Sequence, residues 1–530
     1  MGTTEFDVVV VGAGFAGMYT LHRLRKLGLS TRVVEAGDGV GGTWYWNRYP
    51  GARCDIESMQ YSYQFDAALA QEWNWSEKYS PQPEILSYAE HVAERFKLKS
   101  DIDFNARINQ ATFDDESATW RLESEDGRAW TARYVIFATG CLSVPNWPKV
   151  EGFDEFKGEC YHTAKWPHEP VSFKGKRVAI IGTGSSAIQS LPIIAADAAH
   201  VTVFQRTPNY SIPARNQPMD ADYADSIKHE YPAMRARAKT TFPGIDGPFN
   251  AESALGVSER ERLEEYEARW QAGGLTFMGA YGDLMLDADA NASLANFVRD
   301  KIRSTVNNPG TAELLCPTNI IGGKRLCVDT DYYETYNLSH VELVDVRTAP
   351  IERIVADGVQ VDGRVYEADM IVIATGFDAM TGALISIDIK GLANASLREL
   401  WRDGPSTYLG LAMADFPNLF TVTGPGSPSV FTNMLPTIEQ HVEWITDCIG
   451  HLVSHSYTRI EADAEAQAKW WEHVQDVAKV GLKSTTDSWY VGANVAGKAR
   501  VFLPYFGGFP AYCAKCEEVS SKGYEGFKLS

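Results

Sequence analysis

The sequence predicts an α/β protein, because one pattern of strand, glycine turn, helix and strand occurs twice in the chain. The first copy begins with the apolar run 8–11, and the second begins with the mostly apolar run 177–181. Each run leads into a glycine-rich turn, a stretch of helical character and a second apolar strand. Because 530 residues exceed what one hydrophobic core supports, we expect two or three domains.

The first copy has the spacing of a dinucleotide-binding, Rossmann-like unit. In it, Gly12 permits a tight turn, Gly14 lets the backbone approach a pyrophosphate, and Gly17 lets helix and strand pack closely. The second strand ends in Glu35, 23 positions after Gly12, where a carboxylate can bind ribose hydroxyls. This unit therefore predicts a site for a dinucleotide with an unphosphorylated adenosine ribose, such as FAD. The turn consists of Gly12, Ala13, Gly14, Phe15, Ala16 and Gly17.

The second copy differs where its second strand ends. There the chain carries Gln205 and Arg206, and Arg206 follows Gly182 by 24 positions. An arginine suits a 2′-phosphate through charge-assisted hydrogen bonds, whereas a carboxylate would repel it. The second unit therefore predicts NADP, with a surface role as the alternative for Arg206. Its turn consists of Gly182, Thr183, Gly184, Ser185, Ser186 and Ala187.

The two units suggest the order of domains along the chain. We expect an FAD-binding domain in two parts, 1–141 and 377–530, around an NADP-binding domain at 142–376 with a helical insertion at about 215–320. The runs Ala-Thr-Gly at 138–140 and 374–376 each end an apolar strand, and small residues there let the backbone pass close to a cofactor or another chain. Within the insertion, Ser258 and Glu261 form a capping box that predicts a helix start.

Composition excludes several classes of function. A net charge of −20 disfavours nucleic acid and anionic membrane surfaces as partners. The first apolar stretch, 8–21, is shorter than the ~20 residues of a membrane-spanning helix, and no signal peptide precedes it, so we expect a cytoplasmic protein. Eight scattered cysteines are expected to be reduced. We predict no metal site, because the lone pair Cys513 and Cys516 has no second pair beside it.

Two bound dinucleotides leave several reactions open, since fold does not imply function. Disulfide reductases are disfavoured, because the region at 41–50 holds no cysteine pair. Amine N-hydroxylases, flavin monooxygenases and NADPH oxidases share the same arrangement of two dinucleotide-binding units and remain possible. A nucleotide-binding regulatory protein without oxygenase activity is a further alternative.

The linker before the second unit carries the pattern F-x-G-x-x-x-H-x-x-x-W-P. It resembles the fingerprint of the type I Baeyer–Villiger monooxygenases, and the resemblance extends through the runs 41–46, 49–55 and 424–428 to essentially the whole chain. Within that family the sequence is similar to the phenylacetone and steroid monooxygenase branch. From its residue type alone, His162 is more often a hinge or interdomain histidine than a proton donor. The fingerprint residues are Phe156, Gly158, His162, Trp166 and Pro167.

The resemblance implies a monooxygenase that uses FAD, NADPH and O2 to insert one oxygen atom beside the carbonyl of a hydrophobic ketone. The ketone is cyclic, aryl or steroid-like, the product is a lactone or ester formed through a C4a-peroxyflavin, and sulfides are further substrates. The partners expected are small molecules only, and the protein is expected to be a monomer. The alternative is an N- or S-oxygenating flavin monooxygenase.

The resemblance also implies roles for particular residues. It makes Arg325 the catalytic cation that stabilises anionic oxygens, and Asp55 the carboxylate that positions it. For Arg325, the alternative is a structural or phosphate-binding arginine. The resemblance also implies that Trp489 belongs to a mobile loop, and the alternative is a packing tryptophan. The remaining cofactor contacts are Thr43, Trp44, Tyr45, Trp46, Arg53, Tyr61, Met434, Lys324 and Trp489. The substrate contacts are Ser429, Val430, Phe431 and Leu435.

Overall fold

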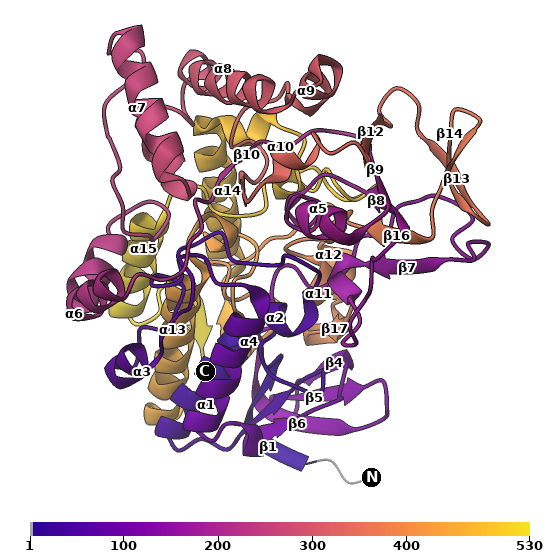
Figure 1. Cartoon of the computed structure of the whole chain (residues 1–530). Helices are drawn as coiled ribbons and strands as arrows, with labels where there is room; N and C mark the ends of the chain where they lie inside the picture. The colour runs from indigo at the N-terminus through magenta and orange to yellow at the C-terminus, as the bar shows by residue number, and fades with distance from the viewer. Residues whose placement is uncertain (1–3) are drawn as a thin grey trace.

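Two β-sheets with helices on their faces organise the chain (Figure 1). The computed structural model describes residues 4–530, so residues 1–3, where the predicted first domain begins, lie outside the described residues. The first sheet occupies the bottom of Figure 1, and the second lies at the right. Between them run the connections at residues 138–150 and 374–380. This arrangement confirms the predicted α/β class with two Rossmann-like units.

The first sheet is built around β1, which pairs in parallel with β2 and β6. Val8, Val9 and Val10 are fully buried, as expected for a parallel strand covered on both faces. The order is β17-β4-β5-β6-β1-β2-β3, with β18 beside β6. The strands are β1 (Thr4–Val11), β2 (Thr31–Val34), β3 (Ile102–Asp103), β4 (Ile108–Asp114), β5 (Thr119–Ser124), β6 (Ala129–Phe137), β17 (Asp388–Lys390) and β18 (Leu419–Thr421).

The second sheet is parallel throughout, in the order β12-β9-β8-β16-β7. Its central strand β8 leads into the second glycine turn, and the fingerprint histidine ends the edge strand β7. The strands are β7 (Glu159–His162), β8 (Arg177–Ile181), β9 (His200–Gln205), β12 (Val341–Asp345) and β16 (Met370–Ile373).

Helices α6 to α9 occupy residues 221–315 and form the left and upper edge of Figure 1. The predicted capping box starts α7, where Glu261 N donates to Ser258 Oγ at 3.3 Å. Their core includes Tyr266, Phe277 and Leu294, and it merges with the core of the second sheet. The helices are α6 (Ala221–Ala238), α7 (Glu259–Ala272), α8 (Ala288–Thr305) and α9 (Pro309–Leu315).

The remaining elements cover the sheets or connect them. The long helix α13 packs along α1, to the left of the first sheet in Figure 1, and most of its residues are buried. The other helices are α1 (Phe15–Lys26), α2 (Thr43–Trp46), α3 (Ala67–Glu72), α4 (Gln82–Arg95), α5 (Ser185–Asp197), α10 (Tyr332–Thr335), α11 (Gly382–Ile385), α12 (Leu397–Leu400), α13 (Met434–Ser454), α14 (Ala464–Val480) and α15 (Phe509–Ser521). The short strands are β10 (Ser211–Pro213), β11 (Cys327–Asp329), β13 (Ile351–Val355), β14 (Gly358–Val361), β15 (Arg364–Glu367), β19 (Ile460–Ala462) and β20 (Phe527–Leu529).

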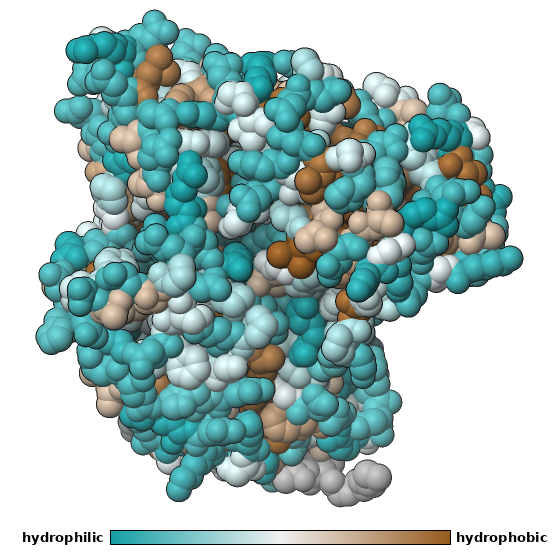
Figure 2. Space-filling view, viewed as in Figure 1, coloured by the Kyte–Doolittle hydropathy of each residue, from teal (hydrophilic) through white to brown (hydrophobic). Residues whose placement is uncertain are grey.

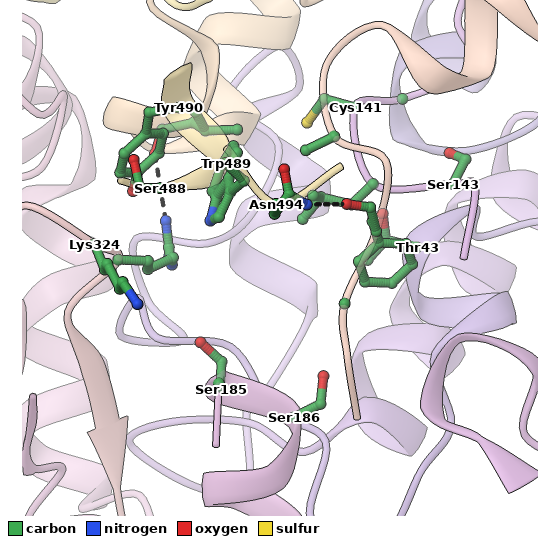
Figure 3. Close-up of a pocket in the computed structure, with 18 of the residues that line it drawn as sticks. Thr43, Cys141, Ser143, Ser185, Ser186, Lys324, Ser488, Trp489, Tyr490 and Asn494 are labelled. Carbon is green, nitrogen blue, oxygen red and sulfur yellow. Dashed lines mark hydrogen bonds between the residues drawn. The ribbon is translucent and has the colours of Figure 1, made fainter. Parts of the chain in front are cut away.

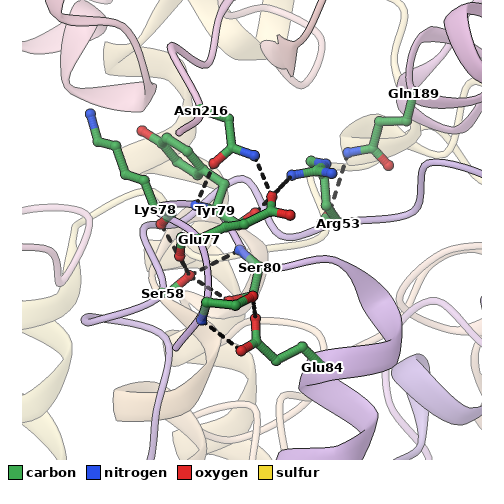
Figure 4. Close-up of polar contacts among 10 residues, drawn as sticks. Arg53, Ser58, Glu77, Lys78, Tyr79, Ser80, Glu84, Gln189 and Asn216 are labelled. Atoms are coloured by element: carbon green, nitrogen blue, oxygen red, sulfur yellow. Dashed lines mark hydrogen bonds and ion pairs between the residues drawn. The ribbon is translucent and has the colours of Figure 1, made fainter. Parts of the chain in front are cut away.

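A polar network holds the two halves of the chain together (Figure 4). Arg53 Nη1 donates to Glu77 Oε2 at 2.9 Å and to the carbonyl of Tyr79 at 2.8 Å. Gln189 on α5 donates to the carbonyl of Arg53, and Asn216 donates to Glu77. Residues 53–79 therefore share one set of hydrogen bonds with Gln189 on α5 and with Asn216.

Candidate active site

A single large cavity lies between the two glycine turns and has a volume of about 2950 Å³. Pockets for drug-sized ligands are about 300–1,000 Å³, so this cavity has room for more than one such ligand. Figure 3 shows its wall, with Ser185 and Ser186 below, Lys324 and Tyr490 on one side, Thr43 on the other, and Trp489 between these groups. Both predicted cofactor sites therefore open into one space.

Each glycine turn packs closely against the backbone of one Ala-Thr-Gly run, and the two contacts have the same geometry. Gly12 has φ +106°, and a Cβ there would lie 2.6 Å from the carbonyl oxygen of Ala138. Gly182 has φ +113°, and its Cβ would lie 2.6 Å from the carbonyl oxygen of Ala374. The two Ala-Thr-Gly runs are thus the strand ends against which each turn packs, which is why glycine is required at both.

On the first side, Glu35 is buried and its carboxylate faces the cavity. It accepts hydrogen bonds from the backbone N–H groups of Ala13, at 2.6 Å, and Gly37, at 2.8 Å. Burial raises the pKa of Glu35, and these hydrogen bonds oppose that shift. Nearby, Trp44 Nε1 donates to the hydroxyl of Tyr61 at 3.1 Å. The carboxylate is therefore held in place before any ribose binds.

On the second side, two cations line the cavity: Arg206, which follows β9, and Lys324. Burial lowers the pKa of Lys324, and the charge of Arg206 lowers it further. Both side chains line the cavity, and Arg206 is exposed. Below them the N-terminus of α5 presents Ser185 and Ser186. Two neighbouring cations and a helix N-terminus make a site suited to a phosphorylated ligand.

Arg325 and Asp55 meet on the wall that these two sides share. The guanidinium donates to Asp55 Oδ2 through Nε at 3.1 Å and Nη2 at 3.0 Å, and Nη1 donates to the carbonyl of Val430 at 3.3 Å. Burial acts to lower the pKa of Arg325, but attraction to Asp55, the hydrogen bond to it and attraction to Tyr490 and Cys54 together outweigh burial and raise that pKa above its ordinary value. Arg325 therefore remains a fixed cation facing the cavity.

The structure brings most of the predicted site residues to this cavity. Arg53 also lines the cavity, but its guanidinium forms an ion pair with Glu77. The predicted residues that line the cavity are Gly12, Gly14, Phe15, Ala16, Glu35, Thr43, Trp44, Trp46, Arg53, Asp55, Tyr61, Trp166, Gly182, Thr183, Gly184, Ser185, Ser186, Arg206, Lys324, Arg325, Val430, Phe431, Met434 and Trp489.

Six predicted contacts lie behind the cavity wall: Gly17, Tyr45, Ala187, Gln205, Ser429 and Leu435. Gly17 packs on the turn itself, because a Cβ there would lie 1.8 Å from the carbonyl oxygen of Gly12. Leu435 is fully buried in the core under α13. Gln205 donates to the carbonyl of Leu314 at 2.7 Å and so ties β9 to α9 rather than facing a ligand.

The fingerprint residues fulfil structural tasks around β7. A Cβ on Gly158 would lie 2.3 Å from the carbonyl oxygen of Asp369. Only glycine therefore lets the backbone at this position come so close to Asp369. His162 is 2 % exposed, and its Nδ1 accepts from the N–H of Ala164 at 3.0 Å. Burial lowers the pKa of His162, and a hydrogen bond with the backbone of Asn146 opposes that shift. The hinge interpretation stays a prediction, and Trp166 is the fingerprint residue that lines the cavity.

Several cavity residues escaped the sequence analysis. Lys483 and Tyr490 line the wall beside Arg325, and Asn494 donates to the carbonyl of Phe377 at 2.6 Å (Figure 3). Their position near Trp489 was the one available signal. A lone lysine or asparagine in a polar run carries no pattern of its own.

Cys513 and Cys516 are free cysteines on α15. No group of three metal-ligating side chains that could hold a metal ion occurs among the described residues. Across residues 4–530, no helix has the length and apolar character needed to span a bilayer. Most of the face in Figure 2 is hydrophilic, with small groups of hydrophobic residues near its middle.

Comparisons with known proteins agree with this geometry. Residues 9–234 match the family model described as pyridine nucleotide-disulphide oxidoreductase. The chain is 40% identical over 530 residues to phenazine N-monooxygenase PhzNO1 of Lysobacter antibioticus, covering 99% of this chain and 97% of that one. It is 38% identical over 529 residues to cyclohexanone 1,2-monooxygenase of Acinetobacter sp, with 99% and 97% covered.

A solved structure of oxidised steroid monooxygenase bound to NADP superposes with a TM-score of 0.95 at 48% identity and 99% coverage of both chains. Identity of this extent along whole chains shows common family membership. The expected cofactors FAD and NADPH, the ketone-oxidising activity and the oxidoreductase class agree with relatives of this kind. The chain belongs to the type I Baeyer–Villiger monooxygenases, FAD-containing and NADPH-dependent enzymes that oxidise ketones to esters or lactones.

Proposed function

We propose that this enzyme oxidises a hydrophobic cyclic, aryl or steroid-like ketone, with Arg325 as the catalytic cation and Asp55 as its positioning carboxylate. The observation that carries the proposal is the Arg325–Asp55 ion pair on the wall that both dinucleotide sites share. A cation held by two hydrogen bonds to one carboxylate keeps its orientation while charge develops in front of it.

The residues fit FAD at the first turn and NADPH at the second. Gly14 and Gly184 leave the backbone bare at the two helix N-termini, and a Cβ on Gly184 would meet nothing within 4 Å. Glu35, held by the N–H of Ala13, would bind ribose hydroxyls, and Arg206 and Lys324 would bind the 2′-phosphate. When bound, FAD and NADPH supply the redox chemistry that transfers one oxygen atom from O2 to the ketone.

The chain's own residues bind the ketone, exclude water and stabilise negative charge. Arg325 lies where it can stabilise an oxyanion on the substrate. Trp489 is half-buried on the cavity side of a loop near the C-terminus and shields this region from solvent.

An apolar wall supports a hydrophobic substrate. Val430 and Phe431 line the cavity beside Arg325, as predicted for substrate contacts. Phe242, Phe249 and Leu286 line the same cavity and remain 42%, 39% and 53% exposed. Large apolar side chains left exposed around a cavity mark a binding surface. We propose that they receive the apolar body of the ketone.

The test is a substrate panel with FAD-loaded enzyme, NADPH and O2. It comprises an aryl-acetone, a small cyclic ketone, a large cyclic ketone, a steroid ketone, an aromatic amine and a sulfide, with products identified by mass spectrometry. Formation of an ester or lactone from a hydrophobic ketone supports the proposal. Oxidation of the amine or sulfide alone would contradict it and favour heteroatom oxygenation.

We also propose that the chain acts as a monomer and divides into domains at 1–141, 142–376 and 377–530. Light scattering of the FAD-loaded protein measures its mass in solution. A mass near the chain's 58.7 kDa supports a monomer, and twice that value contradicts it.

A further inference from the structure

Lys483 projects into the active-site wall from the short 3-10 helix Leu482–Thr485 that follows α14. Its ammonium group donates to the carbonyl of Gly322, three residues before Arg325. It also lies 5.1 Å from the ring centre of Phe431 and 5.4 Å from that of Tyr490. One side chain thus contacts the turn before Arg325, the apolar wall and the loop near the C-terminus.

The surrounding chain, residues 482–498, is here named the closing segment, and it is anchored at both ends. At its start, Leu482 N donates to the carbonyl of Met285 at 2.9 Å. At its end, Lys498 forms an ion pair with Asp378 at 2.6 Å. Between these anchors, Thr486 packs on Gly323, where a Cβ would lie 2.3 Å from its Oγ1. The closing segment therefore lies directly on the turn that carries Arg325.

We propose that Lys483 is a positioning residue for Arg325, and that docking of the closing segment onto residues 322–325 releases a proton from this amine. The hydrogen bond to Gly322 fixes the turn, and the turn fixes the direction from which Arg325 meets Asp55. This coupling is a property of the fold and does not depend on the substrate proposed above.

The electrostatics of the docked state determine the sign of the coupling. Burial, and then the charge of Arg325, lowers the pKa of Lys483 to about 7 from its ordinary 10.5. An undocked segment exposes the amine to water and keeps the ordinary value. Between these two pKa values the undocked state binds more protons, so docking becomes more favourable as pH rises, by up to about tenfold per pH unit. A neutral amine still donates an N–H to Gly322.

The other charged groups around Lys483 do not produce the same titration. Arg325 and Asp55 form an ion pair that keeps the guanidinium charged. Burial raises the pKa of Tyr490 to about 12, above the relevant range. Asp487 pairs with Arg500 at 3.1 Å. Lys324, whose pKa is also lowered, is a competing group and needs its own control variant.

Hydrogen–deuterium exchange tests the coupling on the FAD-loaded enzyme without NADP⁺. Protection of peptides covering 322–326 and 482–498 is measured from pH 6 to pH 9 and corrected for the intrinsic pH dependence of exchange. For the unaltered enzyme, we expect protection to rise with pH, by up to about tenfold per unit above pH 7.

Three variants isolate Lys483. In Lys483→Met, protection of 322–326 falls and the pH dependence disappears, because neither the donor nor the proton remains. In Lys483→Arg, which stays charged, protection is low across the range. Lys324→Met keeps the pH dependence of the unaltered enzyme, since the proton comes from Lys483.

A second control separates docking from titration. Lys498→Met removes the anchor at the other end, so protection falls while its slope against pH remains. A Lys483→Met enzyme with the slope of the unaltered enzyme would overturn the proposal, as would protection that does not rise with pH in the unaltered enzyme. Because no ketone or NADPH is present, these results are independent of the substrate panel.

Discussion

Nη2 of Arg325 lies 3.0 Å from Oδ2 of Asp55, although 270 positions separate the two residues. Asp55 follows the first dinucleotide unit, whereas Arg325 precedes β11, after the helical insertion. Neither half of the chain forms this ion pair alone. The reacting region therefore depends on how the two halves dock, and the network around Arg53 and Glu77 holds that docking in place.

The first prediction concerns the catalytic cation. We expect Arg325→Ala to lower the rate of ester formation by at least about 10²–10³-fold, the usual effect of losing one group that stabilises an oxyanion. FAD content stays unchanged, because Arg325 contacts Asp55 and Val430 rather than the first glycine turn. Rates are measured by product analysis and flavin by absorbance. Asp55→Asn, which keeps the shape but loses the charge, is the matched variant, and full activity of either enzyme would contradict the assignment.

Coenzyme choice supplies the second prediction. Arg206→Ala should weaken NADPH by about 1.5–3 kcal/mol, roughly 10- to 150-fold in Kd, and leave NADH nearly unchanged. The reason is that one charge-assisted contact to the 2′-phosphate is lost. Titration of both coenzymes measures the difference. Lys324→Ala serves as the companion variant, since both cations line the cavity and the charge of Arg206 acts on Lys324. Equal losses for NADPH and NADH would exclude phosphate recognition by Arg206.

The third prediction concerns coupling of NADPH consumption to product. Trp489 is half-buried, and its ring centre lies 4.2 Å from that of Tyr490 at the cavity wall. We expect Trp489→Ala to keep its FAD and its anaerobic reduction but to yield less ester per NADPH, with hydrogen peroxide as the balance. Peroxide and ester are quantified together.

A packing tryptophan provides the control for that variant. Trp401 is 8% exposed in the core beside β17 and lies away from the cavity. Trp401→Ala should lower the melting temperature, because large-to-small changes in a core cost about 3–5 kcal/mol, and leave coupling intact. If Trp489→Ala behaves in the same way, Trp489 is a packing residue and not a shield.

The fourth prediction is a pH dependence of stability that arises from Asp329. This buried carboxyl accepts from Ser211 and from the N–H of Tyr332, and burial raises its pKa to about 7. The folded state therefore holds a proton that the unfolded state loses near pH 4, so this contribution to stability is lost as pH rises to about 7, at up to about 1.4 kcal/mol per unit.

Urea unfolding at pH 5 and pH 8 measures this term. Asp329→Asn should reduce the loss of stability between the two values, because the amide keeps the hydrogen bonds without titrating. Asp331→Asn, an exposed neighbour on the same turn, removes only the smallest of the charges that act on Asp329 and should leave most of the loss in place. An unaltered pH dependence in Asp329→Asn would show that the carboxyl does not titrate in this range.

The sequence by itself determined the fold class and the identity of the two cofactors. These depend on local patterns: glycines at fixed spacing, buried β-branched strands, and the residue that ends each second strand, Glu35 or Arg206. Steric limits on φ and close approach of the backbone depend on a few neighbouring residues, so they can be predicted from the order of residues in the sequence. The equal approach of Gly12 and Gly182 to the two Ala-Thr-Gly strands shows this directly.

Only the tertiary structure decided which side chains face the cavity. Gln205 and Tyr45 stand within recognised motifs, yet one bonds to the carbonyl of Leu314 and the other to Asp38. Lys483 belongs to no motif and lies beside Arg325. The direction in which a side chain points, and its contacts with residues hundreds of positions away, follow from the packing of the two halves of the chain. Burial in that packing then alters the pKa of the titratable groups. Those effects depend on distances in space, which the order of residues does not contain.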